Sequence, residues 1–76
     1  MSYTQELVDE LNLLMQFDLH STQEGIKIHN SAGVGMVKAA ERLHKKGITS
    51  QKDGGYLTDF GIECAERAQT LHDMLS

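Results

Sequence analysis

Apolar residues recur every three or four positions in three stretches of this chain, which is the spacing of an amphipathic helix. The first stretch covers residues 5–17 and follows Thr4, whose hydroxyl can cap a helix N-terminus. The second covers residues 33–46 and stops before Gly47, where glycine can leave a helix with a left-handed backbone. The third follows Thr58, another good N-cap, and continues through the last residues of the sequence. The pattern therefore predicts three helices.

Two short segments between the second and third helices suit β-strands. They are residues 48–50 and 55–57, and the Asp53-Gly54 dipeptide between them strongly favours a tight turn. The sequence therefore predicts a two-stranded β-hairpin that leads directly into the last helix.

The segment from residue 22 to residue 28 fits two interpretations. Ser21 and Glu24 have the spacing of a capping box, in which each side chain bonds the other residue's backbone N–H, and this predicts a short helix over 22–28. Gly25 weakens a helix by about 1 kcal/mol relative to alanine. The alternation of apolar and charged residues over 26–28 also suits a strand. We favour the helix.

The order helix, hairpin, helix is typical of a winged-helix domain. We predict one α+β, winged-helix-like domain over residues 1–76, with three to four helices and a two-stranded β-hairpin wing. A chain of this size buries only about 60% of the surface that its unfolded form exposes, so we expect a thin core.

The cysteine content fits a protein of a reducing compartment. A single cysteine, Cys64, excludes an internal disulfide. No basic-then-apolar leader opens the sequence, and no apolar run approaches the roughly 18 residues that span a bilayer. We therefore expect a soluble cytoplasmic protein that does not associate with membranes.

The charge is unevenly distributed along the sequence. The net charge is −4, but the segment 25–52 carries a net +5. The segment contains one acidic residue, Glu41, and six basic residues: Lys27, Lys38, Arg42, Lys45, Lys46 and Lys52. The flanking segments are strongly acidic, and Asp9 and Glu10 are expected on the solvent side of the first helix. Two interpretations remain open for the basic stretch: a surface for nucleic acid, or solvated lysines that favour the dipole at a helix C-terminus.

Residues 42–48 read R-L-x-x-K-G-I, and residues 56–61 read Y-L-T-x-x-G. Both motifs resemble those of MarR-like winged helix-turn-helix regulators, with the wing exit shortened by one residue. The resemblance implies a second helix over 22–28 and a recognition helix over 33–46. The chain also resembles a small family of uncharacterised proteobacterial proteins of the same length, through the motif T-x-E-L-x-x-E-L-N-L-L at residues 4–14.

These patterns predict a DNA-binding module of the transcription-regulator type. Candidates for contacts to base edges are Asn30, Ser31, Gly35 and Lys38. Candidates for contacts to phosphates are Lys27, Arg42, Lys45 and Lys52, with Ser21 or Thr22 as neutral donors. A plainer interpretation makes Asn30 and Ser31 helix caps and Lys52 a solvated turn residue. So few phosphate contacts predict weak binding by a monomer and useful binding by a dimer.

No residue pattern favours catalysis or a metal site. The four histidines are scattered, and none has a ligand spacing to another histidine or to Cys64. Cys64 lies on the apolar stripe of the last helix, which is typical of a small core residue. We expect no enzyme activity, no metal and no cofactor.

A protein-docking module is the alternative function. Leu71, Met74 and Leu75 give the last helix an apolar edge that could pack on the first helix or on a second copy of the chain. If the acidic flanks were the working surface, the partner would be a basic protein.

Overall fold

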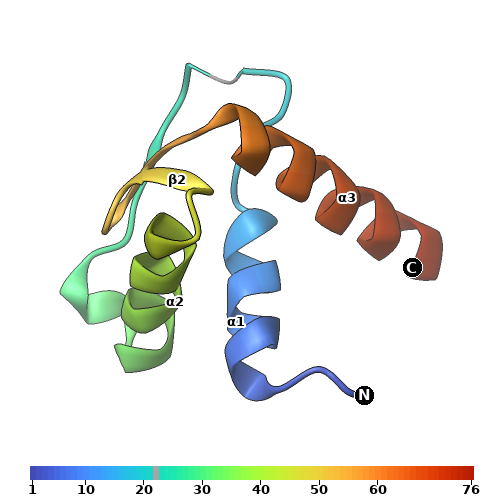
Figure 1. Cartoon of the computed structure of the whole chain (residues 1–76), viewed down its shortest axis with the longest axis horizontal. Coiled ribbons are helices and arrows are strands. Elements are labelled where there is room, and N and C mark those ends of the chain that lie inside the picture. Colours follow the sequence, from blue (N-terminus) through green and yellow to red (C-terminus); the bar gives the residue numbers. More distant parts are fainter. Residues whose placement is uncertain (22) are drawn as a thin grey trace.

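The structure is a computed structural model, and it describes residues 1–21 and 23–76. Its elements, in chain order, are α1 (Gln5–Leu14), β1 (Ile26–Lys27), the 3-10 helix η1 (Asn30–Ala32), α2 (Val34–Lys45), β2 (Thr49–Gln51), β3 (Gly54–Leu57) and α3 (Asp59–Leu75). Helices α1 and α2 stand side by side, the sheet lies at one end of α2, and α3 crosses α1 and extends past it (Figure 1).

The three strands form one antiparallel sheet in the order β1-β3-β2. Ile26 pairs with Gly55 across β1 and β3, and Thr49 pairs with Leu57 across β2 and β3. Three α-helices with this sheet confirm the prediction of an α+β domain with a winged-helix-like layout. The wing differs from the prediction because β1 adds a third strand to the hairpin. The turn also falls one residue earlier than expected, at residues 52–53, so that Gly54 belongs to β3.

The helix predicted over residues 22–28 is wrong for the part of that segment that the structure describes. Residues 26 and 27 form β1, and the backbone N–H of Ile28 donates to the Asp53 carbonyl at 2.7 Å. A Cβ at Gly25 would lie 2.7 Å from the Gly55 carbonyl oxygen, so the missing side chain lets the two backbones pair. The expected capping box is a backbone turn, from the Glu24 N–H to the Ser21 carbonyl at 3.1 Å.

Residue 22 lies outside the described residues, and so does its predicted phosphate contact.

The helix predicted over residues 5–17 ends three residues earlier than expected, because α1 stops at Leu14. Phe17 beyond it is buried.

The predicted helix caps are confirmed. The Thr4 hydroxyl accepts from the Leu7 N–H at 3.2 Å at the start of α1. At the start of α3, the Thr58 hydroxyl accepts from the Gly61 N–H at 3.0 Å. The Gly47 backbone has φ 78°, the left-handed conformation expected at the end of α2. A side chain at Gly61 would collide with the Ile48 carbonyl, so this glycine lets α3 start against the base of the wing.

The core lies where α1, α2, the sheet and the middle of α3 meet. Its buried members are Leu13, Leu14, Ile28, Ala39, Ala40, Leu43, Ile48 and Ala65. Leu13 and Leu43 are the largest fully buried side chains, and they join α1 to α2. Within residues 1–21 and 23–76, no helix has the length and apolar character needed to cross a membrane.

Candidate nucleic-acid interface

Helix α2 has two edges that lie in different surroundings, because successive residues turn by about 100° around a helix. The edge that faces α1, called here the paired edge, consists of Gly35, Arg42 and Lys46. The edge that faces solvent, called here the free edge, consists of Val34, Lys38, Glu41 and Lys45.

Glu10 of α1 neutralises the basic residues of the paired edge. Its side chain is 7% exposed. One carboxylate oxygen accepts from Arg42 Nε at 3.0 Å, and the other accepts from Lys46 Nζ. Arg42 also donates through Nη2 to the Glu6 carbonyl at 3.1 Å, and its Nη1 lies 3.6 Å from the Glu6 carboxylate. The Arg42 guanidinium therefore contacts α1 through Glu6 and Glu10, and these contacts disfavour the phosphate contact that was predicted for it.

The same contacts set the protonation of Glu10. Burial raises the pKa of this carboxyl, but the hydrogen bonds and charges of Lys46 and Arg42 outweigh it and hold the pKa below its usual value. Glu10 therefore stays ionised at neutral pH. The expectation that Glu10 lies on the solvent side of its helix is wrong, because α2 supplies two cations for it to contact.

The predicted base contact at Gly35 also faces α1. A Cβ at this position would lie 3.0 Å from Asp9 Oδ2, and Asp9 accepts from Gln5 Nε2 at 2.9 Å. A carboxylate beside the first turn of α2 suits the positive end of the helix dipole. It also places a negative charge next to the position where a base edge was expected.

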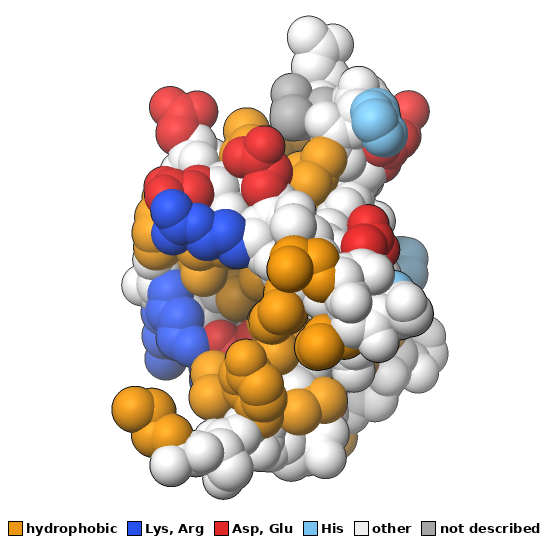
Figure 2. All heavy atoms as spheres, turned by 90° about the vertical axis from the view of Figure 1, so that its right-hand side faces the viewer, with side chains coloured by type: hydrophobic (Ala, Val, Ile, Leu, Met, Phe, Trp, Pro, Cys, Tyr) orange, Lys and Arg blue, Asp and Glu red, His pale blue; other side chains and the backbone are white. Residues whose placement is uncertain are grey.

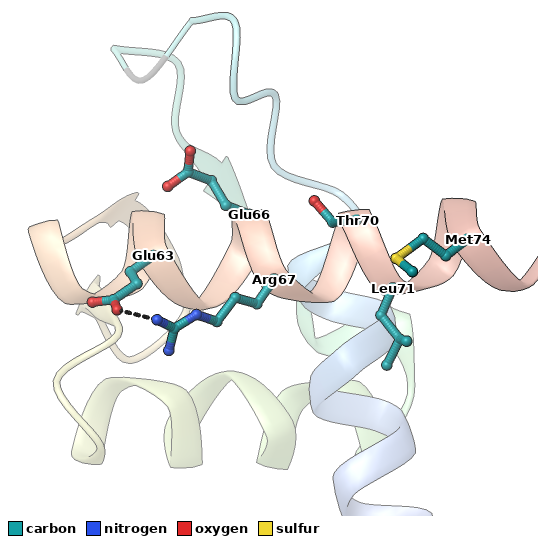
Figure 3. A pocket seen from close by; sticks show the side chains of 6 residues that line it. All are labelled: Glu63, Glu66, Arg67, Thr70, Leu71 and Met74. Carbon is teal, nitrogen blue, oxygen red and sulfur yellow. Dashed lines mark ion pairs between the residues drawn. The ribbon is translucent and has the colours of Figure 1, made fainter.

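Four lysines remain available to solvent. Lys27, Lys38, Lys45 and Lys52 are exposed, and none forms an ion pair among the described residues. The other three basic side chains are all paired: Arg42 and Lys46 with α1, and Arg67 with Glu63 at 2.7 Å on α3 (Figure 3). All four available lysines belong to the predicted contact set. Glu41 is the acid that lies among them on the free edge.

Asn30 and Lys52 lie around one shallow hollow of about 160 Å³ between η1, α2 and the tip of the wing. The hollow is lined by Ile28, Asn30, Val37, Ala40, Glu41, Lys52 and Asp53. Asn30 and Ser31 are both exposed, and neither caps α2, whose N-cap is Gly33. The capping interpretation of these two residues is therefore wrong for the start of α2.

The side of the molecule formed by the N-terminal segment, α1 and the end of α3 carries an apolar patch. Six exposed large hydrophobic residues, on the N-terminal segment, on α1 and on the C-terminal turns of α3, define the docking face: Met1, Tyr3, Leu7, Leu71, Met74 and Leu75. Figure 2 shows apolar side chains forming a band down the middle of this side, with basic side chains at one margin. The face contains the apolar edge that the sequence predicted for the last helix.

Sequence reasoning missed the partnership of α1 with α2. Glu6 and Glu10 are four residues apart, and so are Arg42 and Lys46, so each pair shares one face of its helix. That spacing was the available signal, but nothing in the sequence says that the two faces meet. Among the described residues, no group of three or more His, Cys, Asp or Glu side chains is arranged to hold a metal ion.

Comparison with known proteins identifies the family of the chain but not its function. Residues 1–76 match the model of a family described as a family of unknown function (DUF5669). No curated protein and no solved structure matches the chain significantly.

Proposed function

We propose that this chain, which belongs to the DUF5669 family, binds DNA through its four available lysines without catalysing a reaction. The observation that carries the proposal is the sorting of the basic side chains. Three of the seven are neutralised inside the fold or along a helix, whereas Lys27, Lys38, Lys45 and Lys52 stay exposed and unpaired among the described residues.

The winged-helix-like layout supports the choice of duplex DNA. In such domains one helix enters the major groove and the wing contacts the neighbouring backbone. Here Lys38 and Lys45 lie on the solvent-facing edge of α2, Lys52 at the wing tip and Lys27 on β1. Exposed Asn30 and Ser31 in η1 are the neutral donors nearest the start of α2, and they are the remaining candidates for base contact.

The proposed binding is weak for a single chain. Each phosphate contact contributes a slope of about −0.9 to the logarithm of the binding constant against the logarithm of salt, so four contacts give about −3.6. Arg42 is left out of this count because its guanidinium contacts Glu6 and Glu10. The overall charge of −4 opposes binding anywhere outside the lysine surface.

The test is a salt titration of the full chain on a labelled DNA duplex, followed by fluorescence anisotropy. The variant with Lys38→Gln and Lys45→Gln should lower the slope by about 1.8 and weaken binding at every salt concentration. The control is Arg67→Gln, which removes an exposed cation from α3 and should leave the slope unchanged at protein concentrations where the chain is monomeric. Absence of binding by the wild type even at low salt would overturn the proposal, as would equal slopes for all three proteins.

Protein docking is the second candidate, and the docking face favours it. Leu75 is 80% exposed and Met74 is 76% exposed, and both lie beside Leu71 at the end of α3. From the sequence, this edge could pack on the first helix or on a second copy. Capture of a partner by the wild type but not by Leu75→Glu would support docking, and the lysine variants should leave that capture intact.

A further inference from the structure

The docking face combines a ridge with a groove. The ridge consists of Leu71, Met74 and Leu75 on the last turns of α3. The groove, about 340 Å³ in volume, lies between α1, α3 and the C-terminal end of α2, and Leu71 of the ridge forms part of its wall. Its other apolar lining comes mainly from Leu7, Leu11, Leu14, Leu43, Ile48 and Ala68. Figure 2 shows the apolar side chains of this side as one continuous band. Because ridge and groove lie next to each other on one face, a two-fold rotation can place each ridge in the groove of the other copy.

The charges around the face also match those of a second copy. Arg67 stands at the rim of the groove with its side chain 78% exposed, and its ion pair among the described residues is the surface pair with Glu63 one turn away (Figure 3). Asp73 stands beside the ridge with its side chain 80% exposed. A two-fold arrangement that seats the ridge in the groove brings Asp73 of one copy toward Arg67 of the other, and does so twice.

The rest of the surface is unfavourable for pairing two identical chains. The molecule carries a net charge of −4, so most approaches bring acids against acids. The charged residues that line the groove are Glu10, Lys46 and Arg67, and the first two already pair with each other. The docking face is therefore a part of this acidic protein where two copies can meet without net repulsion.

The available area sets the strength of the contact. The side shown in Figure 2 measures 29 × 20 Å between Cα atoms. A stable interface covers about 800 Å² of accessible surface on each partner, so a second copy must cover nearly the whole side. The contact is at the small end for a dimer, and we expect it to form and dissociate reversibly.

From the ridge, the groove and the charge pattern, we infer that the partner of the docking face is a second copy of this chain. This inference rests on the docking candidate above and names its partner. It is independent of DNA binding, because the four available lysines lie outside the docking face.

The test is sedimentation equilibrium of the full chain from about 5 to about 500 µM, without nucleic acid. The mass should rise with concentration from 8.5 kDa toward twice that value. Leu75→Glu should raise the dissociation constant at least tenfold, because it places a charge on the ridge. Val34→Glu is the matched control: Val34 is 72% exposed on the free edge of α2, so its variant should dimerise like the wild type. Circular dichroism checks that both variants fold.

A charge exchange identifies the face. Arg67→Glu alone and Asp73→Arg alone should each weaken the dimer several-fold, and the double variant should recover most of the loss. The two residues are six positions apart on α3, and no ion pair joins them within one chain, so recovery requires a second copy. A wild type that stays at 8.5 kDa over the whole range would overturn the inference. The docking function would then be tested separately, by whether the wild type captures another protein. A dimer that tolerates Leu75→Glu would overturn the inference as well.

Discussion

The two edges of α2 carry the same kind of side chain in opposite surroundings. On the paired edge, Arg42 and Lys46 contact the buried carboxylate of Glu10 and hold α2 against α1. On the free edge, Lys38 and Lys45 extend into solvent without an ion pair among the described residues. Lys45 and Lys46 are neighbours in the sequence, yet the turn of the helix between them separates a cation that stabilises the fold from one that is available to a ligand. A segment that is basic throughout its sequence therefore contributes to two surfaces with different roles.

The largest expected effect is at the centre of the paired edge. Glu10→Gln keeps the shape of the side chain but removes the charge that Arg42 and Lys46 contact. We expect it to lower the free energy of unfolding by about 1.5–3 kcal/mol, the usual value for a hydrogen bond to a charged group. Urea unfolding followed by circular dichroism measures this. A loss below about 0.5 kcal/mol would mean that the pairs contribute no more than surface ion pairs.

Low pH should weaken the contacts of the paired edge as Glu10→Gln does, because protonation also removes the charge of Glu10. The pKa of Glu10 is lower in the folded chain than its usual value of 4.5, so the unfolded chain takes up the proton more readily. The stabilisation by Glu10 is therefore complete above pH 4.5 and is lost as the pH falls through the lower, folded pKa. The difference in stability between the wild type and Glu10→Gln should shrink in that acidic range. A difference that is constant from neutral pH into strong acid would contradict the assignment.

A smaller effect separates the two edges directly. Arg42→Gln should lower the free energy of unfolding by about 1 kcal/mol, because Glu10 keeps Lys46 as a partner. Lys45→Gln should change it by less than about 0.5 kcal/mol, as expected for a surface site. The salt slope of DNA binding should show the reverse order, with the larger decrease for Lys45→Gln. Equal behaviour of the two variants in both measurements would remove the distinction between the edges.

The smallest effect concerns the acid on the free edge. Glu41 lies between Lys38 and Lys45 and repels any phosphate near them. A unit charge about 8 Å away in water contributes roughly 0.5 kcal/mol, so Glu41→Gln should tighten DNA binding roughly twofold. Its melting temperature should match that of the wild type. Unchanged affinity in a low-salt anisotropy titration would indicate that the ligand does not approach this edge.

Local signals predicted much of the fold. Thr4 and Thr58 start their helices as expected, because a cap depends only on residues within one turn. The left-handed Gly47 is local in the same sense, and the wing turn was predicted to within one residue. For the segment 22–28 we favoured the helix over the strand, which was wrong for residues 26–27, because a two-residue strand exists only through pairing with β3, which is distant in the sequence.

The candidate site was predicted less completely. The sequence identified the basic residues, and the four lysines that stay available are all among those named. It did not show that Arg42 and Gly35 face α1, because their neighbours Glu6, Glu10 and Asp9 lie about 26 or more positions away along the chain. The carboxylates looked solvated only because their partners are supplied by another helix.

The starts of the helices, the region of the wing turn and the basic segment could all be predicted from residue type, since short-range hydrogen bonds and charge depend on it. Which cations are neutralised and which apolar side chains stay exposed could not, because both follow from how the helices pack. Both outcomes depend on how α1 meets α2 and α3, and that packing is set by the shared core around Leu13 and Leu43.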